Sequence, residues 1–317
     1  MKKYLKIARI DHWIKNLFII PGTVIAILLT NDSLADVHFL TFALGFLSTC
    51  FIASANYVIN EWLDAPFDKY HPTKKNRPAV SENMKLSYVL LEYFIFIFAG
   101  CILASLINQY FLYTELFLLL MGVLYNVKPI RTKDIPYLDV LSESVNNMIR
   151  LLLGWFVVDV THLPPSSILI GYWMGGAFLM ATKRFAEYRM INNAQIAGLY
   201  RKSFSYSSEK TLAGSALFYG MVATFCIGVF LIKYRIEYLL SMPVIFLLFA
   251  YYFCMSYNRD SAAQKPEKLY KEKMLIFLVS CVIVVLGICT FCDIPALEIF
   301  VSKELLRLKC QIVKKTS

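Results

Sequence analysis

Long apolar runs alternate with shorter polar stretches along the whole chain. Each run is close to the ~20 residues that an α-helix needs to cross the hydrocarbon core of a bilayer. Nine such runs are predicted, over residues 16–31, 37–60, 86–107, 109–127, 140–161, 166–182, 213–232, 237–256 and 274–292. The pattern predicts a single all-α polytopic membrane domain, with an interfacial segment over residues 1–15 and a basic tail over 293–317.

The composition agrees, since 58% of residues are hydrophobic and the mean hydropathy is +0.57. The net charge of +10 comes from 32 Lys and Arg against 22 Asp and Glu. If the N-terminus and every second loop share one side, that side holds 24 of these 32 bases, and the opposite short loops hold Lys233 and Arg235. This asymmetry argues against a nucleic-acid partner and places the basic side in the cytoplasm. The expected location is a bacterial inner membrane.

The tail is the exception to this topology. Residues 302–317 carry five further bases, yet an odd number of spans would place them on the outer side. Two explanations stay open, because the tail can lie as an amphipathic interfacial helix or the count can be wrong by one.

Polar residues recur every four positions at the end of the second run, and the set is Asn56, Asn60, Asp64 and Asp68. Residues four apart share one helical face, with Asn60 and Asp68 about 12 Å apart along the axis. Carboxylate and amide oxygens suit Mg²⁺ that also binds substrate phosphates. His71, Lys74 and Arg77 follow, and such bases suit phosphate oxygens. The alternative is a solvated helix end, but the set begins inside an apolar run, where polar groups are costly.

A second polar stretch has the same design. It begins with a loop and continues into a helix, and its candidate residues are Tyr125, Arg131, Lys133, Asp139, Glu143, Asn147 and Arg150. The helical members again share one face. Glu143 and Arg150 alone are compatible with a structural ion pair. Two acid and amide stripes that begin near basic loops on the same side are better interpreted as two halves of one metal and phosphate site.

Further bases lie in two places on the same side of the membrane. In residues 183–187 we expect Lys183 to pair with Glu187 and to leave Arg184 for a phosphate, although a positive membrane anchor is an equal alternative. Lys15 and Asn16 near the N-terminus are further candidates to face the site. Residues 200–210 and 258–274 are interpreted as loops and anchors.

The spacing Asn60-x3-Asp64-x3-Asp68, with Asp139-x3-Glu143 in a second helix, resembles the UbiA-type intramembrane prenyltransferase superfamily. The stretches "HPTKKNRP", "WIKN" and "TKRFAE" resemble its decaprenyl-phosphate phosphoribosyltransferase branch. The chain departs from the usual pattern at Glu61 and Glu143, where Asp is common, and both keep a carboxylate.

The resemblance implies about nine helices around a central cavity that opens to the cytoplasmic side. It implies Mg²⁺ as cofactor, with the metal ligands Asn60, Asp64, Asp68, Asp139 and Glu143, of which the four acids are the catalytic residues. The implied substrate-binding residues are Asn56, His71, Lys74, Arg77, Tyr125, Arg131, Lys133, Asn147, Arg150, Lys183, Arg184, Lys15 and Asn16.

The expected reaction is transfer of 5-phosphoribose from phosphoribosyl diphosphate to a polyprenyl phosphate. The alternative is transfer of a prenyl group from a prenyl diphosphate to an aromatic or other acceptor. A transporter is less favoured, because the charges gather at the helix ends on one side, and a conduction path needs polar groups through the full thickness.

Overall fold

The computed structural model describes residues 2–30, 39–258, 269 and 271–300, which form helices and connecting loops without a strand. The longer helices are α2 (Ile20–Thr30), α3 (Phe39–Asp68), α5 (Leu86–Ser105), α6 (Gln109–Asn126), α7 (Leu138–Phe156), α8 (Ser166–Ile191), α10 (Glu209–Tyr234), α11 (Met242–Met255) and α12 (Lys273–Phe291). The shorter helices, with 3₁₀ turns written η, are α1 (Lys2–Ile7), η1 (Ile10–Ile19), η2 (Lys74–Asn76), α4 (Pro78–Ser81), η3 (Thr132–Asp134), α9 (Ala194–Tyr200), η4 (Lys202–Tyr206), η5 (Ile236–Ser241) and η8 (Pro295–Phe300).

The all-α prediction is confirmed, and each predicted apolar run coincides with one of the longer helices. Six helical segments of the described chain are long and apolar enough to cross a membrane, namely Lys3–Thr30, Phe39–Asp68, Leu86–Ser105, Glu209–Tyr234, Ile236–Met255 and Lys273–Phe291. The count of nine spans therefore stays a prediction. Helices α6, α7 and α8 are not among these segments, and α7 carries Asp139, Glu143 and Arg150 within its 19 residues. The basic tail from residue 301 onward lies outside the described residues.

Two helices extend well beyond their predicted apolar runs. Helix α3 continues past residue 60 to Asp68, so the whole first polar stripe lies on one helix. Helix α8 continues past residue 182 to Ile191 and carries the third charged cluster. The apolar runs end at the first charged residues. Each helix continues beyond that point with polar residues spaced four apart, because its polar face is turned toward the protein interior.

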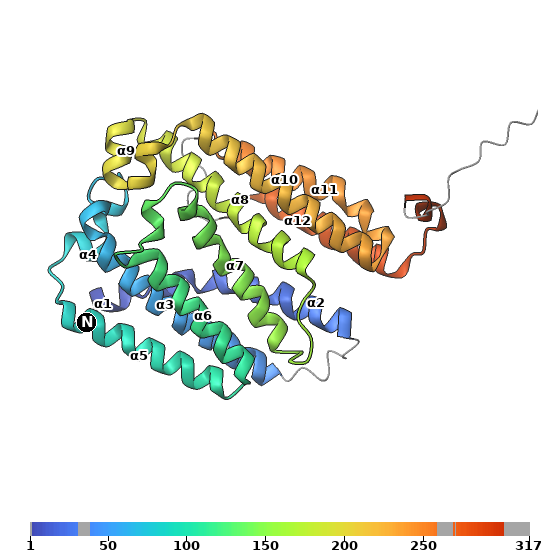
Figure 1. Cartoon of the computed structure of the whole chain (residues 1–317), viewed down its shortest axis with the longest axis horizontal. Coiled ribbons are helices and arrows are strands. Elements are labelled where there is room, and N and C mark those ends of the chain that lie inside the picture. Colours follow the sequence, from blue (N-terminus) through green and yellow to red (C-terminus); the bar gives the residue numbers. More distant parts are fainter. Residues whose placement is uncertain (1, 31–38, 259–268, 270, 301–317) are drawn as a thin grey trace, which may run out of the picture.

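The helices pack in two groups that α7 joins (Figure 1). Helix α3 packs against α5 and α6, while α8 packs against α10. Helix α7 contacts α2, α6 and α8. A Cβ atom at Gly154 would lie 2.0 Å from the carbonyl oxygen of Ile19, so this glycine permits the close approach of α7 to the N-terminal segment. The arrangement brings the polar faces of α3, α7 and α8 toward one another.

Apolar side chains also cover much of the outer surface. Phe98 on α5, Phe225 on α10 and Ile283 on α12 are each more than 60% exposed. Outward-facing apolar helices of this kind match a surface that contacts lipid. The short helices α4 and α9 lie at the same end of the bundle, where Lys74 contacts Tyr200 (Figure 1).

Candidate active site

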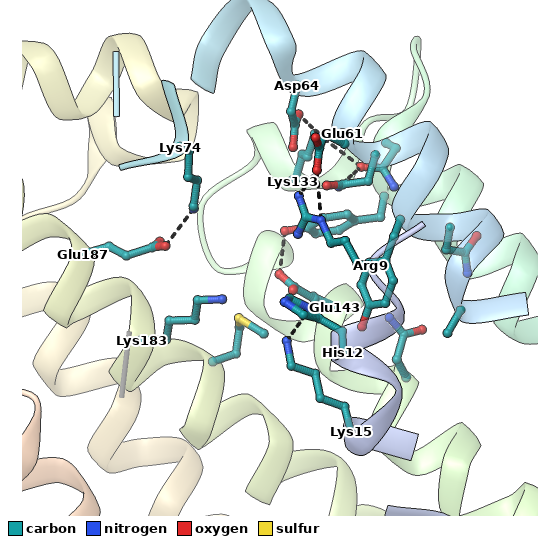
Figure 2. Close-up of a pocket in the computed structure, with 18 of the residues that line it drawn as sticks. Arg9, His12, Lys15, Glu61, Asp64, Lys74, Lys133, Glu143, Lys183 and Glu187 are labelled. Atoms are coloured by element: carbon teal, nitrogen blue, oxygen red, sulfur yellow. Dashed lines mark hydrogen bonds and ion pairs between the residues drawn. The ribbon is translucent and has the colours of Figure 1, made fainter. Parts of the chain in front are cut away.

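A cavity of about 1210 Å³ opens between α3, α7, α8 and the N-terminal segment. Its wall contains all the predicted site residues except Asn16 and Asp139. Figure 2 shows acids and bases facing one another across this space, with Lys74, Lys183 and Glu187 opposite Glu143 and Lys133. The structure thus brings the residues of both stripes and of the third cluster to one cavity.

The acids of the first stripe are bound by bases from two loops. Asp64 accepts hydrogen bonds from Arg131 Nη2 at 3.0 Å and from Lys133 Nζ. Asp68, which is 2% exposed, accepts from Arg77. The bases that we expected to bind phosphate are therefore also the partners of the acids that we expected to bind metal.

Asn126, at the end of α6, connects this stripe to its loop. Its Oδ1 accepts from Asn60 Nδ2 at 2.5 Å and from Lys133 Nζ at 2.7 Å, and its carbonyl oxygen accepts from Arg131 at 3.0 Å. Burial lowers the pKa of Lys133 to about 8, although the neighbouring Asp64 opposes that change. The loop is thus fixed against α3 by a polar network that sequence reasoning did not predict.

Asn56 marks the deeper part of the stripe. Its Nδ2 donates to the carbonyl oxygen of Leu118 at 3.0 Å, while its buried Oδ1 has no partner among the described residues. A Cβ atom at Gly122 would lie 2.0 Å from this oxygen, so the glycine leaves room for the amide. A buried acceptor without a partner on a cavity wall is suited to a ligand donor or a cation.

The second stripe is held by Arg184. Glu143 accepts from Arg184 Nη2 and from the Tyr125 hydroxyl, both at 2.6 Å. The alternative of a Glu143–Arg150 ion pair is therefore wrong, because Arg184 occupies this carboxylate.

The expected pairing in the third cluster is reversed. Glu187 accepts from Arg184 Nη1 at 2.9 Å and from Lys74 Nζ at 2.9 Å. Within the described residues no carboxylate lies within 4.0 Å of Lys183. The prediction that Lys183 pairs with Glu187 and leaves Arg184 unpaired is wrong. Neighbouring residues on a helix point about 100° apart, and here Arg184 turns toward Glu143.

Two predicted site residues lie behind the cavity wall. Asp139 is 4% exposed and accepts from Ser203 Oγ at 3.0 Å and from Arg201 at 3.5 Å. Asn16 accepts from Arg150 Nε at 3.0 Å and is 1% exposed. In this arrangement Asp139 holds the 201–203 loop, and Asn16 orients Arg150.

The loop after α3 closes one end of the cavity. His71 Nδ1 accepts from the backbone N–H groups of Thr73 and Lys74, each at 3.2 Å, and its ring lies 4.6 Å from that of Tyr200. Burial, with Lys74 nearby, lowers the pKa of His71 to about 3. His71 is therefore neutral at physiological pH, and its Nδ1 holds the turn at Thr73 and Lys74.

Several wall residues were missed by the sequence analysis. Tyr200 and Arg201 reach the cavity from the segment interpreted as a loop and anchor. Arg9 pairs with Glu61, and its Nη2 lies 2.6 Å from Oε2. Neither Arg9 nor Arg201 belongs to a stripe of polar residues spaced four apart in the sequence, so helical periodicity did not indicate them. Glu61 follows Asn60 directly and was noted as a carboxylate position.

The described residues contain no group of three or more His, Cys, Asp and Glu side chains placed to hold a metal ion by themselves. The wall does present the oxygens of Asn60, Asp64 and Asp68 from one face of α3. This donor set fits Mg²⁺, which keeps waters and takes further ligands from substrate phosphates rather than from an all-protein cage.

The sequence profile of the UbiA prenyltransferase family matches residues 19–281. The nodulation protein NoeC of Azorhizobium caulinodans is 26% identical over 212 residues, which cover 66% of this chain and 65% of that protein. The decaprenyl-phosphate phosphoribosyltransferase of Mycolicibacterium smegmatis is 29% identical over 212 residues, covering 65% and 63%. The matches thus span less than two thirds of these relatives' lengths.

Solved structures give the same fold. A UbiA homologue from Archaeoglobus fulgidus bound to GPP and Mg²⁺ superposes with a TM-score of 0.68 at 19% identity, over 90% of this chain and 99% of that one. The same homologue has also been solved with DMAPP and Mg²⁺ and with Cd²⁺. With six apolar helices of spanning length among the described residues, these likenesses identify a multi-pass integral membrane protein.

Proposed function

The chain belongs to the UbiA prenyltransferase family, and from this premise we propose a Mg²⁺-dependent intramembrane transferase that displaces diphosphate from an activated donor. The proposed donor is phosphoribosyl diphosphate and the proposed acceptor a polyprenyl phosphate, so that 5-phosphoribose is transferred. The reaction is proposed at the cytoplasmic face of a bacterial inner membrane, where the basic loops gather.

The charge of the cavity wall carries this proposal. The described wall contains twelve Lys and Arg but seven Asp and Glu, a surplus of five positive charges. Phosphoribosyl diphosphate brings three phosphate groups and a polyprenyl phosphate a fourth, whereas a prenyl diphosphate brings two. A cavity with this surplus matches the more highly phosphorylated pair. The curated relative named a decaprenyl-phosphate phosphoribosyltransferase points the same way.

The residues of α3 are proposed to hold the metal. Asn60, Asp64 and Asp68 would bind Mg²⁺ together with the donor diphosphate, with Glu143 on the facing helix. When bound, the ion stabilises the negative charge that develops on the departing diphosphate. Asp139 lies behind the wall, so we assign it to the 201–203 loop rather than to the metal.

The bases beside these acids would stabilise the same negative charge on the departing diphosphate. Arg77, Arg131 and Lys133 contact the α3 carboxylates and lie on the wall, so they are placed to bind the diphosphate oxygens as the bond to carbon breaks. Charge-assisted contacts of this kind lower the barrier where charge develops. A polyprenyl phosphate is already an anion at pH 7, so the proposed attack needs no general base.

A second candidate function is prenyl transfer from a prenyl diphosphate. It is favoured by the structural neighbour solved with GPP and Mg²⁺. The same acids and bases would then bind the prenyl diphosphate, and the acceptor would be an aromatic acid or a related compound.

Purified protein tests these alternatives. We expect a mild-acid-labile lipid product from radiolabelled phosphoribosyl diphosphate and decaprenyl phosphate with Mg²⁺, and its loss with EDTA or in Asp64→Asn. Glu209→Gln, which changes an exposed acid outside the cavity wall, is the matched control. Transfer at the wild-type rate by Asp64→Asn without Mg²⁺ would refute the metal assignment. Product from a prenyl diphosphate and an aromatic acid, with none from phosphoribosyl diphosphate, would establish the second candidate.

A further inference from the structure

The bases of the cavity wall differ in whether they have an acidic partner. Seven have a carboxylate within 4.0 Å, and they are Arg9, Lys74, Arg77, Arg131, Lys133, Arg184 and Arg201. Arg150 and Lys183 also line the cavity, and within the described residues neither has a carboxylate at that distance. Arg150 is buried and Lys183 is half-buried. A cation withdrawn from water without a contacting carboxylate is costly, so these two positions point to an anion that arrives as a ligand.

Arg150 is held in a fixed orientation. It is 8% exposed, its Nε donates to Asn16 Oδ1 at 3.0 Å, and its Nη1 donates to the carbonyl oxygen of Asn146 at 3.2 Å. Among the described residues its Nη2 has no hydrogen-bond partner, although the side chain lines the cavity. The guanidinium is therefore positioned by two neutral groups and keeps donor capacity for a ligand.

Lys183 and Lys15 approach the same space from other elements. Figure 2 shows the Lys183 amine pointing from α8 into the cavity, with Lys15 on the facing wall, where its Nζ lies 3.0 Å from His12 Nδ1. The charge of Lys183 is attracted by Glu187, which lies beyond 4.0 Å, and is repelled by Lys15. Arg150 lines the same cavity and bonds Asn16, the residue next to Lys15. Positive charges gathered in one cavity suit a phosphate group.

Arg150 and Lys183 lie farther from the charged helix ends than Glu143 and Glu187, the acids on the same helices. Arg150 is seven residues beyond Glu143 on α7, or about 10 Å along the helix axis. Toward the membrane interior from Lys183 and Lys15, the wall is apolar, with Leu179 and Met180 on α8 and Leu17 and Phe18 after Lys15. A phosphate at these bases therefore has an apolar path for an attached chain.

We propose that Arg150, Lys183 and Lys15 form a phosphate subsite that binds the headgroup of the lipid acceptor without metal, separately from the diphosphate subsite at Asp64 and Asp68. This inference rests on the proposed function, which it deepens by assigning the two anionic substrates to different walls. We call these three residues the acceptor subsite.

The separation of the two subsites suits the reaction. An oxygen of the acceptor phosphate attacks the anomeric carbon of the donor ribose and forms a new C–O bond, while the bond from that carbon to the diphosphate breaks and the diphosphate leaves with the electron pair. Attack from the side opposite the leaving group requires the two anions to occupy separate places. No proton transfer and no further reactant are needed.

Direct binding without metal tests the subsite. Farnesyl phosphate, farnesol, inorganic phosphate and ribose 5-phosphate are titrated into purified protein in EDTA, with calorimetry as the readout. We expect farnesyl phosphate to bind tightest and to lose about tenfold or more in affinity in Lys183→Met and Arg150→Met. Arg189→Met, on α8 but outside the cavity wall, is the matched control and should bind like wild type.

Three results would overturn the inference. They are unchanged farnesyl phosphate affinity in Lys183→Met, a requirement of wild-type protein for Mg²⁺ to bind farnesyl phosphate, and tighter Lys183-dependent binding of ribose 5-phosphate, which would assign these bases to the donor. The wild-type titration in EDTA and the milder Lys183→Gln keep the test valid if the Met variants do not fold. Farnesyl phosphate binding through Lys183 without any phosphoribosyl transfer would support the subsite and refute the proposed function instead.

Discussion

Glu187 offers a sharp test of how charge stabilises this fold. Its side chain is 2% exposed and accepts from Lys74 and Arg184, each at 2.9 Å. The substitution Glu187→Gln keeps the size of the side chain but removes its negative charge. Arg184 retains Glu143 at 2.6 Å, and Lys74 retains its contact with Tyr200, so each base loses one of its partners.

The magnitude follows from the burial of the groups. Removing one partner of a buried ion pair typically costs about 3–5 kcal/mol, and the remaining contacts favour the lower end, near ~3 kcal/mol. For a chain of this length each kcal/mol lowers Tm by about 2–3 °C, so we expect a fall of roughly 6–9 °C.

Thermal unfolding in detergent micelles measures the effect. The matched control is Glu209→Gln, which breaks the Arg189–Glu209 pair at 3.2 Å, where the side chains are 35% and 51% exposed. Exposed pairs contribute about 0–1 kcal/mol, so the control should shift Tm by at most about 3 °C.

A double variant separates the two possible causes of the loss. Lys74→Met combined with Glu187→Gln removes both members of one pair, so it should recover part of the loss because one unpaired cation has gone. The reasoning fails if Glu187→Gln and the exposed control shift Tm equally, or if the two substitutions in the double variant are simply additive.

Three further outcomes follow from the described contacts. The pKa of His71 is lowered to about 3 by burial, so its contribution to stability is present above pH 6.5 and is lost as the pH falls toward 3; His71→Asn should flatten the fall of Tm with pH across that window. Gly154→Ala should lower Tm because its Cβ would meet backbone 2.0 Å away, whereas Gly175→Ala, with nothing within 4 Å, should leave Tm unchanged or higher. Tyr125→Phe removes a 2.6 Å hydrogen bond to Glu143, and we expect the transfer rate to fall about fivefold, a loss of ~1 kcal/mol, with Tm preserved. An unchanged rate in Tyr125→Phe would show that this hydroxyl does not position the carboxylate.

The periodic part of the site could be predicted from the sequence because helical periodicity is local. Asn60, Asp64 and Asp68 lie on one face of α3 whatever the rest of the chain does, and that face lines the cavity. The pairing of charges is not local. Whether Lys183 or Arg184 meets Glu143 depends on how α8 is rotated against α7, and the apolar pattern of a helix with charged and apolar faces does not fix that angle to within one residue.

Residues outside regular periodicity were beyond prediction for a different reason. Arg201 follows the short helix α9, and its position depends on Ser203 and Asp139, which lies more than 60 residues earlier in the chain. A contact of this kind leaves no trace in a window of neighbouring residues. Asp139 belongs to the periodic stripe of α7, yet the same loop draws it behind the cavity wall.

The pairing of acids with bases has a consequence for how the proposed substrates bind. Arg131 and Lys133 both contact Asp64 Oδ1, so a cation that binds this oxygen competes with them, and the displaced bases are then free to bind the oxygens of a phosphate. A divalent cation and a diphosphate should therefore raise each other's affinity, and by the same factor in both directions, since the coupling is a single free energy.

Lys133→Met removes one of the bases that competes for Asp64. We expect it to bind Mg²⁺ more tightly than wild type in the absence of anion and to show a smaller coupling when inorganic diphosphate is added, both measured by calorimetry. Equal coupling in the variant and the wild type would show that the two ligands do not communicate through this ion pair.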